Sequence, residues 1–142
     1  MYEDILVPTD GGDDVDRVVD HALDIARRRD ARIHALYVVD TRSFITLGAE
    51  TVDEVVAELT ATGEQATAAV ADRAAEAGLE TVEEVRRGNP AEVILDYCFE
   101  TDVDLVTMGN HDEQDQRAML GSVAQQVVAK SAVPVLTVQV GD

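Results

Sequence analysis

The chain has a single cysteine, Cys98, so it cannot form a disulfide within itself. Its apolar runs are interrupted well before the ~18 residues that cross a membrane, and we therefore expect no membrane span. The N-terminal residues lead into an apolar strand pattern without a basic segment or a cleavage site. These absences favour a soluble, cytoplasmic domain over a secreted or membrane protein.

Cationic side chains are also scarce, because 11 Lys and Arg stand against 29 Asp and Glu and give a formal net charge of -18. Nucleic acids and anionic membrane surfaces are bound through Lys and Arg, so we expect neither as a partner. In dilute buffer such a charge repels itself, whereas molar salt reduces the range of the repulsion to ~3 Å. The acids are spread over the predicted helices at residues 13–29, 51–77 and 90–101, which favours adaptation to a high-salt cytoplasm over an acidic face for a basic partner.

Catalytic groups are few as well. The chain contains no G-x-x-x-x-G-K-[S/T] phosphate loop and no C-x-x-C pair. Cys98 lies among apolar residues on the predicted buried face of a helix, which indicates a core thiol and not a reactive one. His21 and His34 are predicted to lie on the surface of a helix and of a strand. We predict no catalytic residue and no resident metal site.

A length of 142 residues with 46% hydrophobic residues suits one domain, residues 1–142, with one core. Strand patterns are predicted at residues 3–7, 32–39, 81–85, 105–108 and 134–140. Helix patterns are predicted at residues 13–29, 51–77 and 90–101 and from Gly121 onward. Between residues 40 and 49 the pattern predicts a loop with exposed Phe44, Ile45 and Leu47. Strands separated by helices indicate a mainly parallel sheet with right-handed crossovers.

The segment after the fourth predicted strand has the composition of a phosphate-binding turn. Gly109 opens a loop, and Gly121-Ser122 are predicted at the head of the next helix. Backbone N–H groups at a helix start are unpaired donors at the positive end of the helix dipole, and a glycine lets a ligand approach them. Ser122 is equally suited to capping the helix, so these residues alone leave both roles open.

This segment resembles the pattern G-x2-G-x9-G-[S/T] of the nucleotide-binding members of the universal stress protein family. Gly109 matches the first glycine, and Gly121-Ser122 match the last pair. Asp112 stands where the pattern has its second glycine, and eleven residues instead of twelve separate Gly109 from Gly121. The likeness continues in ILVPTDGG at residues 5–12, HALDIA at 21–26, YVVD at 37–40, GNPAEVIL at 88–95, DLVTMGNH at 104–111 and PVLTV at 134–138.

The resemblance implies a doubly wound α/β domain of five mainly parallel strands in the order 3-2-1-4-5, with helices on both faces. That order reverses between the first and fourth strands, and ligands of open α/β sheets bind beside such a point at the carboxyl ends of the strands. It also implies that ATP is held there, with Mg2+ or Mn2+ on its phosphates. The matching positions are Pro8, Thr9, Asp10, Val39, Met108, Gly109, Asn110, His111, Gly121, Ser122 and Val123.

Asp10 has two compatible roles in this picture, since its carboxylate can accept a hydrogen bond from ribose or adenine and can also cap the following helix. Acidic residues oppose the phosphates in the loop itself, at Asp112, Glu113 and Asp115. At ~8 Å each carboxylate–phosphate charge pair costs ~0.5–1 kcal/mol, so the loop weakens binding tenfold to a thousandfold unless salt, Mg2+ or Arg117 offsets it.

The resemblance implies a homodimer formed through the C-terminal strand, residues 133–140, whose bare edge would otherwise invite aggregation. Three functions stay open. The first is regulatory adenine-nucleotide binding in a stress response, supported by Asp10, Gly109 and Gly121-Ser122. The second is a nucleotide-independent dimeric interaction module, supported by Asp112 and the shortened loop. The third is a slow ATPase in which Asp10 or His111 activates a water.

Overall fold

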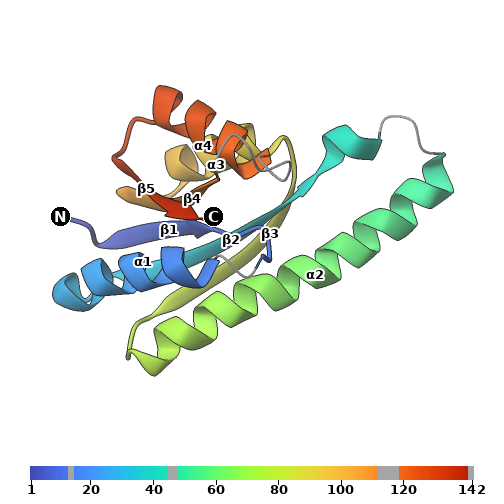
Figure 1. Cartoon of the computed structure of the whole chain (residues 1–142). Helices are drawn as coiled ribbons and strands as arrows, with labels where there is room; N and C mark the ends of the chain where they lie inside the picture. Colours follow the sequence, from blue (N-terminus) through green and yellow to red (C-terminus); the bar gives the residue numbers. More distant parts are fainter. Residues whose placement is uncertain (13–14, 45–47, 112–118, 141–142) are drawn as a thin grey trace.

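The computed structural model describes residues 1–12, 15–44, 48–111 and 119–140. One five-stranded parallel sheet forms its centre (Figure 1). The strands are β1 (Asp4–Pro8), β2 (Arg32–Asp40), β3 (Thr81–Gly88), β4 (Leu105–His111) and β5 (Val135–Val140). The helices are α1 (Val15–Arg29), the 3-10 helix η1 (Thr41–Phe44), α2 (Ala49–Glu76), α3 (Pro90–Glu100) and α4 (Met119–Lys130).

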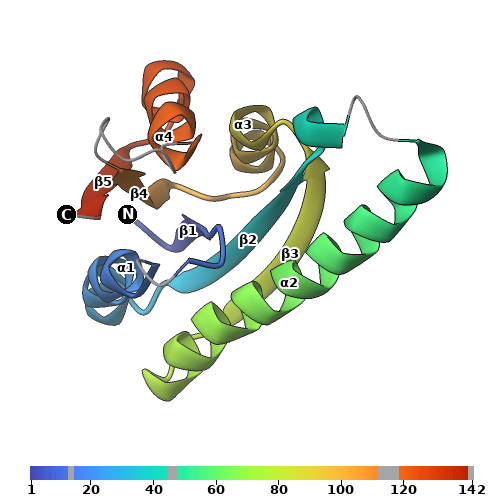
Figure 2. The same ribbon diagram turned by 45° about the vertical axis from the view of Figure 1, so that its right-hand side comes forward.

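The strand order is β3-β2-β1-β4-β5, which confirms the order implied by the resemblance. Helices α1 and α2 cover one face of the sheet, and α3 and α4 cover the other (Figure 2). β3 and β4 each run three residues further than the pattern predicted, to Gly88 and His111, because their neighbours β2 and β5 pair with them to those ends. In the described part of the chain, no helix combines the length and the apolar character that crossing a membrane requires.

Side chains of the inner strands are buried on both faces, as expected for a sheet covered on both sides. Ile5 and Val7 pack with the buried face of α1, whereas Leu6 packs with apolar residues of α3 and α4. A third, smaller cluster joins Tyr37, Val39 and Phe44 to the apolar stripe of α2. Phe44 was predicted to be exposed, and this was wrong: η1 turns its ring back against α2, where it is only 8% exposed. Ile45 and Leu47 lie outside the described residues.

His34 is also buried, which corrects the prediction that it lies on the surface. Its Nδ1 is 2.6 Å from the hydroxyl of Tyr97, and its Nε2 is 2.8 Å from a carboxylate oxygen of Asp4. A strand covered on both faces has no surface side, so the imidazole is placed inside and both ring nitrogens receive partners. His21 is exposed on α1, as predicted.

Three local features of the helices follow from residue type and burial. Cys98 is partly buried, and burial raises the pKa of its thiol to about 11, so the thiol stays protonated at neutral pH. Asn89 accepts a hydrogen bond from the backbone N–H of Glu92 at 3.3 Å and so caps α3 ahead of Pro90. Gly63 permits close packing, because a methyl carbon placed on it would lie 2.5 Å from Cδ1 of Tyr37.

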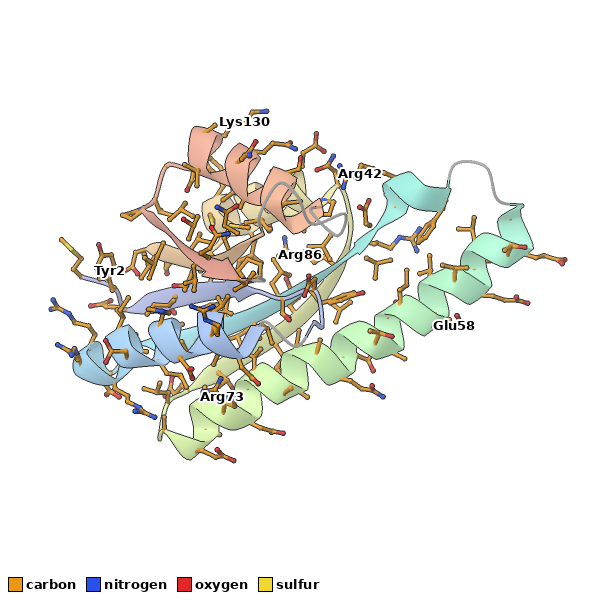
Figure 3. The ribbon with its side chains drawn as sticks, in the orientation of Figure 1. Tyr2, Arg42, Glu58, Arg73, Arg86 and Lys130 are labelled. Carbon is orange, nitrogen blue, oxygen red and sulfur yellow. The ribbon has the colours of Figure 1, made fainter. Side chains whose placement is uncertain are left out.

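Three arginines each bind two carboxylates and so join neighbouring elements. Two of them, Arg73 and Arg86, are labelled in Figure 3. The groups are Arg32 with Asp4 and Glu80, Arg73 with Asp16 and Asp20, and Arg86 with Glu84 and Glu100. Arg73 connects α2 to α1, and Arg86 connects β3 to α3. The Arg86 guanidinium also lies 4.8 Å from the centre of the Tyr97 ring.

One buried hydroxyl in β4 is unsatisfied, which leads to a test of stability. Among the described residues, Oγ1 of Thr107 is a buried side-chain oxygen without a hydrogen-bond partner. Thr107→Val keeps the shape of the side chain and removes the unpaired group, so we expect the free energy of unfolding to rise by about 1 kcal/mol. Urea denaturation measures this. The control is Thr67→Val, which removes a buried hydroxyl that donates to the Gly63 carbonyl at 3.0 Å. The free energy of unfolding should fall in this control. Equal effects of the two changes would contradict the argument.

Candidate functional site

Neighbouring strands part at the carboxyl edge of the sheet where the strand order reverses. β1 pairs with β4 through Ile5 with Leu105 and Leu6 with Val106. Beyond that point β1 stays with β2, and the Thr9 N–H donates to the Leu36 carbonyl at 2.8 Å. β4 stays with β5 as far as the pair His111 and Val140. The ends of β1 and β4 therefore separate at the point where the strand order reverses, which is where ligands of open α/β sheets bind.

The β1 side of this point is a tight turn held by its own side chains. Oγ1 of Thr9 accepts the N–H of Gly11 at 3.1 Å, and Oδ1 of Asp10 accepts the N–H of Gly12 at 2.8 Å. Gly11 has φ of +80°, a left-handed conformation that suits glycine. Thr9 is buried and Asp10 is exposed. Asp10 thus fixes the turn that leads into α1, a role related to the predicted helix cap, and its carboxylate stands at the surface.

The β4 side is formed by strand backbone. Gly109, Asn110 and His111 belong to β4, so the prediction that a loop begins at Gly109 was wrong by three residues. Met108 is fully buried and packs with residues of α3 and α4, so it can meet a ligand only through its backbone. Gly109 is buried beside Val138 of β5, and Asn110 is half-buried. Asp112, Glu113, Asp115 and Arg117 lie outside the described residues.

Helix α4 begins two residues earlier than predicted. It starts at Met119, so Gly121 and Ser122 are its third and fourth residues and not its head. Ser122 therefore does not occupy the N-cap position, and its side chain is exposed. Gly121 still belongs to the first turn, in which backbone N–H groups lack partners within the helix. Val123, the residue after Ser122, is 4% exposed and packs in the core.

The β2 side contributes a buried residue and a cation that the sequence reasoning missed. Val39 is 1% exposed, so its side chain serves the core. In the next residues, Nε and Nη2 of Arg42 donate to the two carboxylate oxygens of Asp40 at 2.9 and 2.7 Å (Figure 3). These hydrogen bonds hold the pKa of the Asp40 carboxyl below its usual range. The D-x-R spacing at the end of a predicted strand was the available signal for this pair.

The structure thus brings most of the predicted positions to one edge of the sheet. The predicted positions lie at or next to the ends of three adjacent strands: residues 8–10 at β1, Val39 at β2 and residues 108–111 at β4. Residues 121–123 belong to the first half of α4. The side chains of Val39, Met108 and Val123 are core residues, so only their backbone groups are available to a ligand. Over the described ranges, no group of three or more His, Cys, Asp or Glu is arranged to hold a metal ion.

Sequence comparison places close relatives among archaeal proteins. Over 141 residues the chain is 36% identical to the universal stress protein MJ0531 of Methanocaldococcus jannaschii, covering 98% of this chain and 83% of the relative. It is 35% identical to a universal stress protein of Methanothermobacter thermautotrophicus over 136 residues, covering 90% and 89% of the two chains.

Solved structures agree in fold over nearly the whole chain. The structure of MJ0577, from the same M. jannaschii, has a TM-score of 0.86 at 26% identity and covers 100% of this chain and 99% of its own. A universal stress protein in complex with cAMP has a TM-score of 0.73 at 28% identity, with 96% and 97% covered. One from Archaeoglobus fulgidus in complex with dAMP has a TM-score of 0.67 at 26% identity, with the same coverage.

A family model described as the universal stress protein family matches residues 1–139. The strand order is the one implied by the resemblance in the sequence. The chain belongs to the universal stress protein family.

Proposed function

We propose that this protein binds an adenine nucleotide, ATP in particular, in the crevice between the Asp10 turn and the Gly109 end of β4, and that it acts as a regulatory module in a stress response. The observation that carries the proposal is the separation of β1 from β4 beyond Leu6 and Val106, at the point where the strand order reverses.

Two relatives support this choice of ligand, because cAMP and dAMP share with ATP an adenine, a ribose-type sugar and a phosphate. In this chain the exposed Asp10 carboxylate is suited to accept a hydrogen bond from the sugar or the base. The N–H groups of the first turn of α4, including that of Gly121, are suited to phosphate oxygens. Mg2+ or Mn2+ on the phosphates would offset the acids between Asp112 and Asp115.

A second candidate is a nucleotide-independent, dimeric interaction module. It is favoured by the acids and the missing residue between Gly109 and Gly121, which oppose a polyphosphate. In both cases we infer a homodimer that pairs through β5. This strand stands at one edge of the sheet, and its apolar residues Val135 and Leu136 are only half-buried. ATP hydrolysis would at most be slow. From the charge we infer a high-salt cytoplasm as the location.

The proposal predicts saturable binding of ATP. In isothermal titration with Mg2+ in molar KCl, we expect a micromolar or weaker dissociation constant, and Gly121→Val should weaken it about tenfold, since its side chain blocks approach to the first turn of α4. Ser122→Ala removes the exposed hydroxyl and should likewise weaken ATP binding. Ala129→Val, an exposed change in the last turn of the same helix, is the control and should leave binding unchanged. Absence of heat at millimolar ATP in both high and low salt would exclude the nucleotide role.

A further inference from the structure

Tyr37 lies between α2 and the turn that carries Asp10. It is a residue of β2, it is 8% exposed, and it belongs with Val39 and Phe44 to the cluster under α2. Two glycines lie close to this ring, Gly63 of α2 and Gly11 of the turn after β1. Neither the proposed ligand contacts nor the packing of the main core requires a tyrosine here.

The backbone of α2 rests directly on one edge of the ring. A methyl carbon placed on Gly63 would lie 2.5 Å from Cδ1, 2.9 Å from Cγ and 3.1 Å from Cε1 of Tyr37. A glycine inside a helix costs about 1 kcal/mol relative to alanine, so close approach to the ring is the physical reason for a glycine at this point of a 28-residue helix. The ring therefore sets the distance between α2 and β2.

The opposite edge of the ring faces the turn after β1. A methyl carbon placed on Gly11 would lie 4.0 Å from Cε2 of Tyr37 and 3.7 Å from Cβ of Ala66 on α2. Burial raises the pKa of the Tyr37 hydroxyl, and the negative charge of Asp10 raises it further. The turn that contains Thr9, Asp10 and Gly12 thus lies next to the ring on which α2 rests.

We infer that Tyr37 is a positioning residue for the Asp10 turn and that α2, through Gly63, determines where Tyr37 stands. As a statement about ligand affinity, this rests on the proposed nucleotide site. A close-packed contact of this kind transmits displacement, so a shift of α2 against the sheet moves the turn. Coupling is reciprocal, so a ligand held by the turn also changes the packing of α2.

The position of α2 makes this coupling accessible from outside the crevice. Its N-terminal half, together with η1, extends beyond the edge of the sheet (Figures 1 and 2). The apolar residues that it turns toward the sheet there, Val52, Val55 and Val56, are only partly buried. A displacement of this half of α2 is transmitted to Tyr37 through the contact at Gly63. Helix α2 can therefore regulate the site without touching the ligand.

The test uses three variants and one control. Gly63→Ala forces the ring aside, Tyr37→Leu removes the support, and Tyr37→Phe keeps the ring and removes the hydroxyl. We expect about tenfold weaker ATP binding by titration for the first two, and binding close to that of the unchanged protein for Tyr37→Phe. The control Gln65→Ala is an exposed change on the same helix and should have no effect.

Hydrogen exchange of the Gly11 and Gly12 amides, followed by NMR without nucleotide, provides a readout that does not depend on ATP. These N–H groups donate hydrogen bonds to the side-chain oxygens of Thr9 and Asp10, so their exchange rates report on the turn itself. We expect exchange about tenfold faster in Gly63→Ala and Tyr37→Leu and unchanged in Tyr37→Phe and Gln65→Ala.

The outcomes separate this inference from the proposed function. If the unchanged protein binds no ATP, the nucleotide role fails, while the exchange rates still decide whether Tyr37 positions the turn. If Gly63→Ala and Tyr37→Leu leave the exchange of both amides unchanged, the inference is overturned. Should Gly63→Ala not fold, as judged by circular dichroism, Tyr37→Leu alone decides the point, because it removes the ring and leaves α2 intact.

Discussion

Raising KCl from about 0.1 M to about 2 M is expected to raise the midpoint of thermal unfolding by at least about 10 °C, equivalent to about 2–3 kcal/mol. The reason is the formal net charge of -18, which repels itself in the folded state more strongly than in the expanded chain. Molar salt shortens the reach of that repulsion to a few ångströms, below the spacing of most surface charges. Scanning calorimetry over a series of KCl concentrations measures the effect.

Charge removal on α2 provides the control for this experiment. Asp53, Glu54 and Glu58 are exposed residues of α2, and Figure 3 shows Glu58 on the side of the helix that faces away from the sheet. The variant Asp53→Asn, Glu54→Gln, Glu58→Gln should be more stable at low salt and should respond less to KCl. A midpoint that does not change with KCl in the original chain would remove the basis for a high-salt cytoplasm.

Restoring the family pattern between Gly109 and Gly121 is expected to strengthen ATP binding by ~1–3 kcal/mol, which is about fivefold to about 150-fold. The variant carries Asp112→Gly, one glycine inserted after Glu113, and Asp115→Asn. It removes two carboxylates that oppose the phosphates and regains close backbone approach. Titration with ATP at low and high KCl measures the gain, which should be largest at low salt because screening is weakest there.

Two controls separate the causes of that gain. Asp112→Asn with Asp115→Asn removes the same charges without changing the backbone, so it should give only the salt-dependent part of the improvement. Adenosine carries no phosphate, and its affinity should be the same for the original and restored chains. If the restored chain binds ATP no better than the original in any salt, the crevice does not bind phosphate here, and the nucleotide-independent module becomes the preferred function.

Much of the fold could be predicted from periodicity and from the family resemblance. Runs such as residues 5–8 and 33–39 are apolar on both faces, which is typical of parallel strands between two helical layers, and Asn89-Pro90 marks the start of a helix. The predicted position of the site followed from strand order, because β1 and β4 are neighbours and their carboxyl ends separate where that order reverses.

The errors occurred where tertiary packing decides a residue's environment. A histidine in a strand pattern does not reveal whether both faces of that strand are covered, and the partners of His34 lie 30 and 63 positions away in the chain. Phe44 is buried because η1 and α2 meet over it, which no local pattern indicates. Strand β4 continues past Gly109 because β5 pairs with it, and a glycine alone suggested a loop.

The three arginines that bind two carboxylates each give one physical reason for an unusual feature of the composition. The chain contains ten arginines and one lysine. A planar guanidinium directs five N–H donors along fixed lines, so one positive charge can serve two acids at once, whereas a lysine ammonium acts as a compact point charge. In a protein with far more acids than bases, this geometry allows few cations to join helices to helices and strands to helices. Arginine is thereby well suited to connect elements in an acidic fold, and an exchange for lysine at such a junction would replace the planar fork by a compact ammonium with fewer donors.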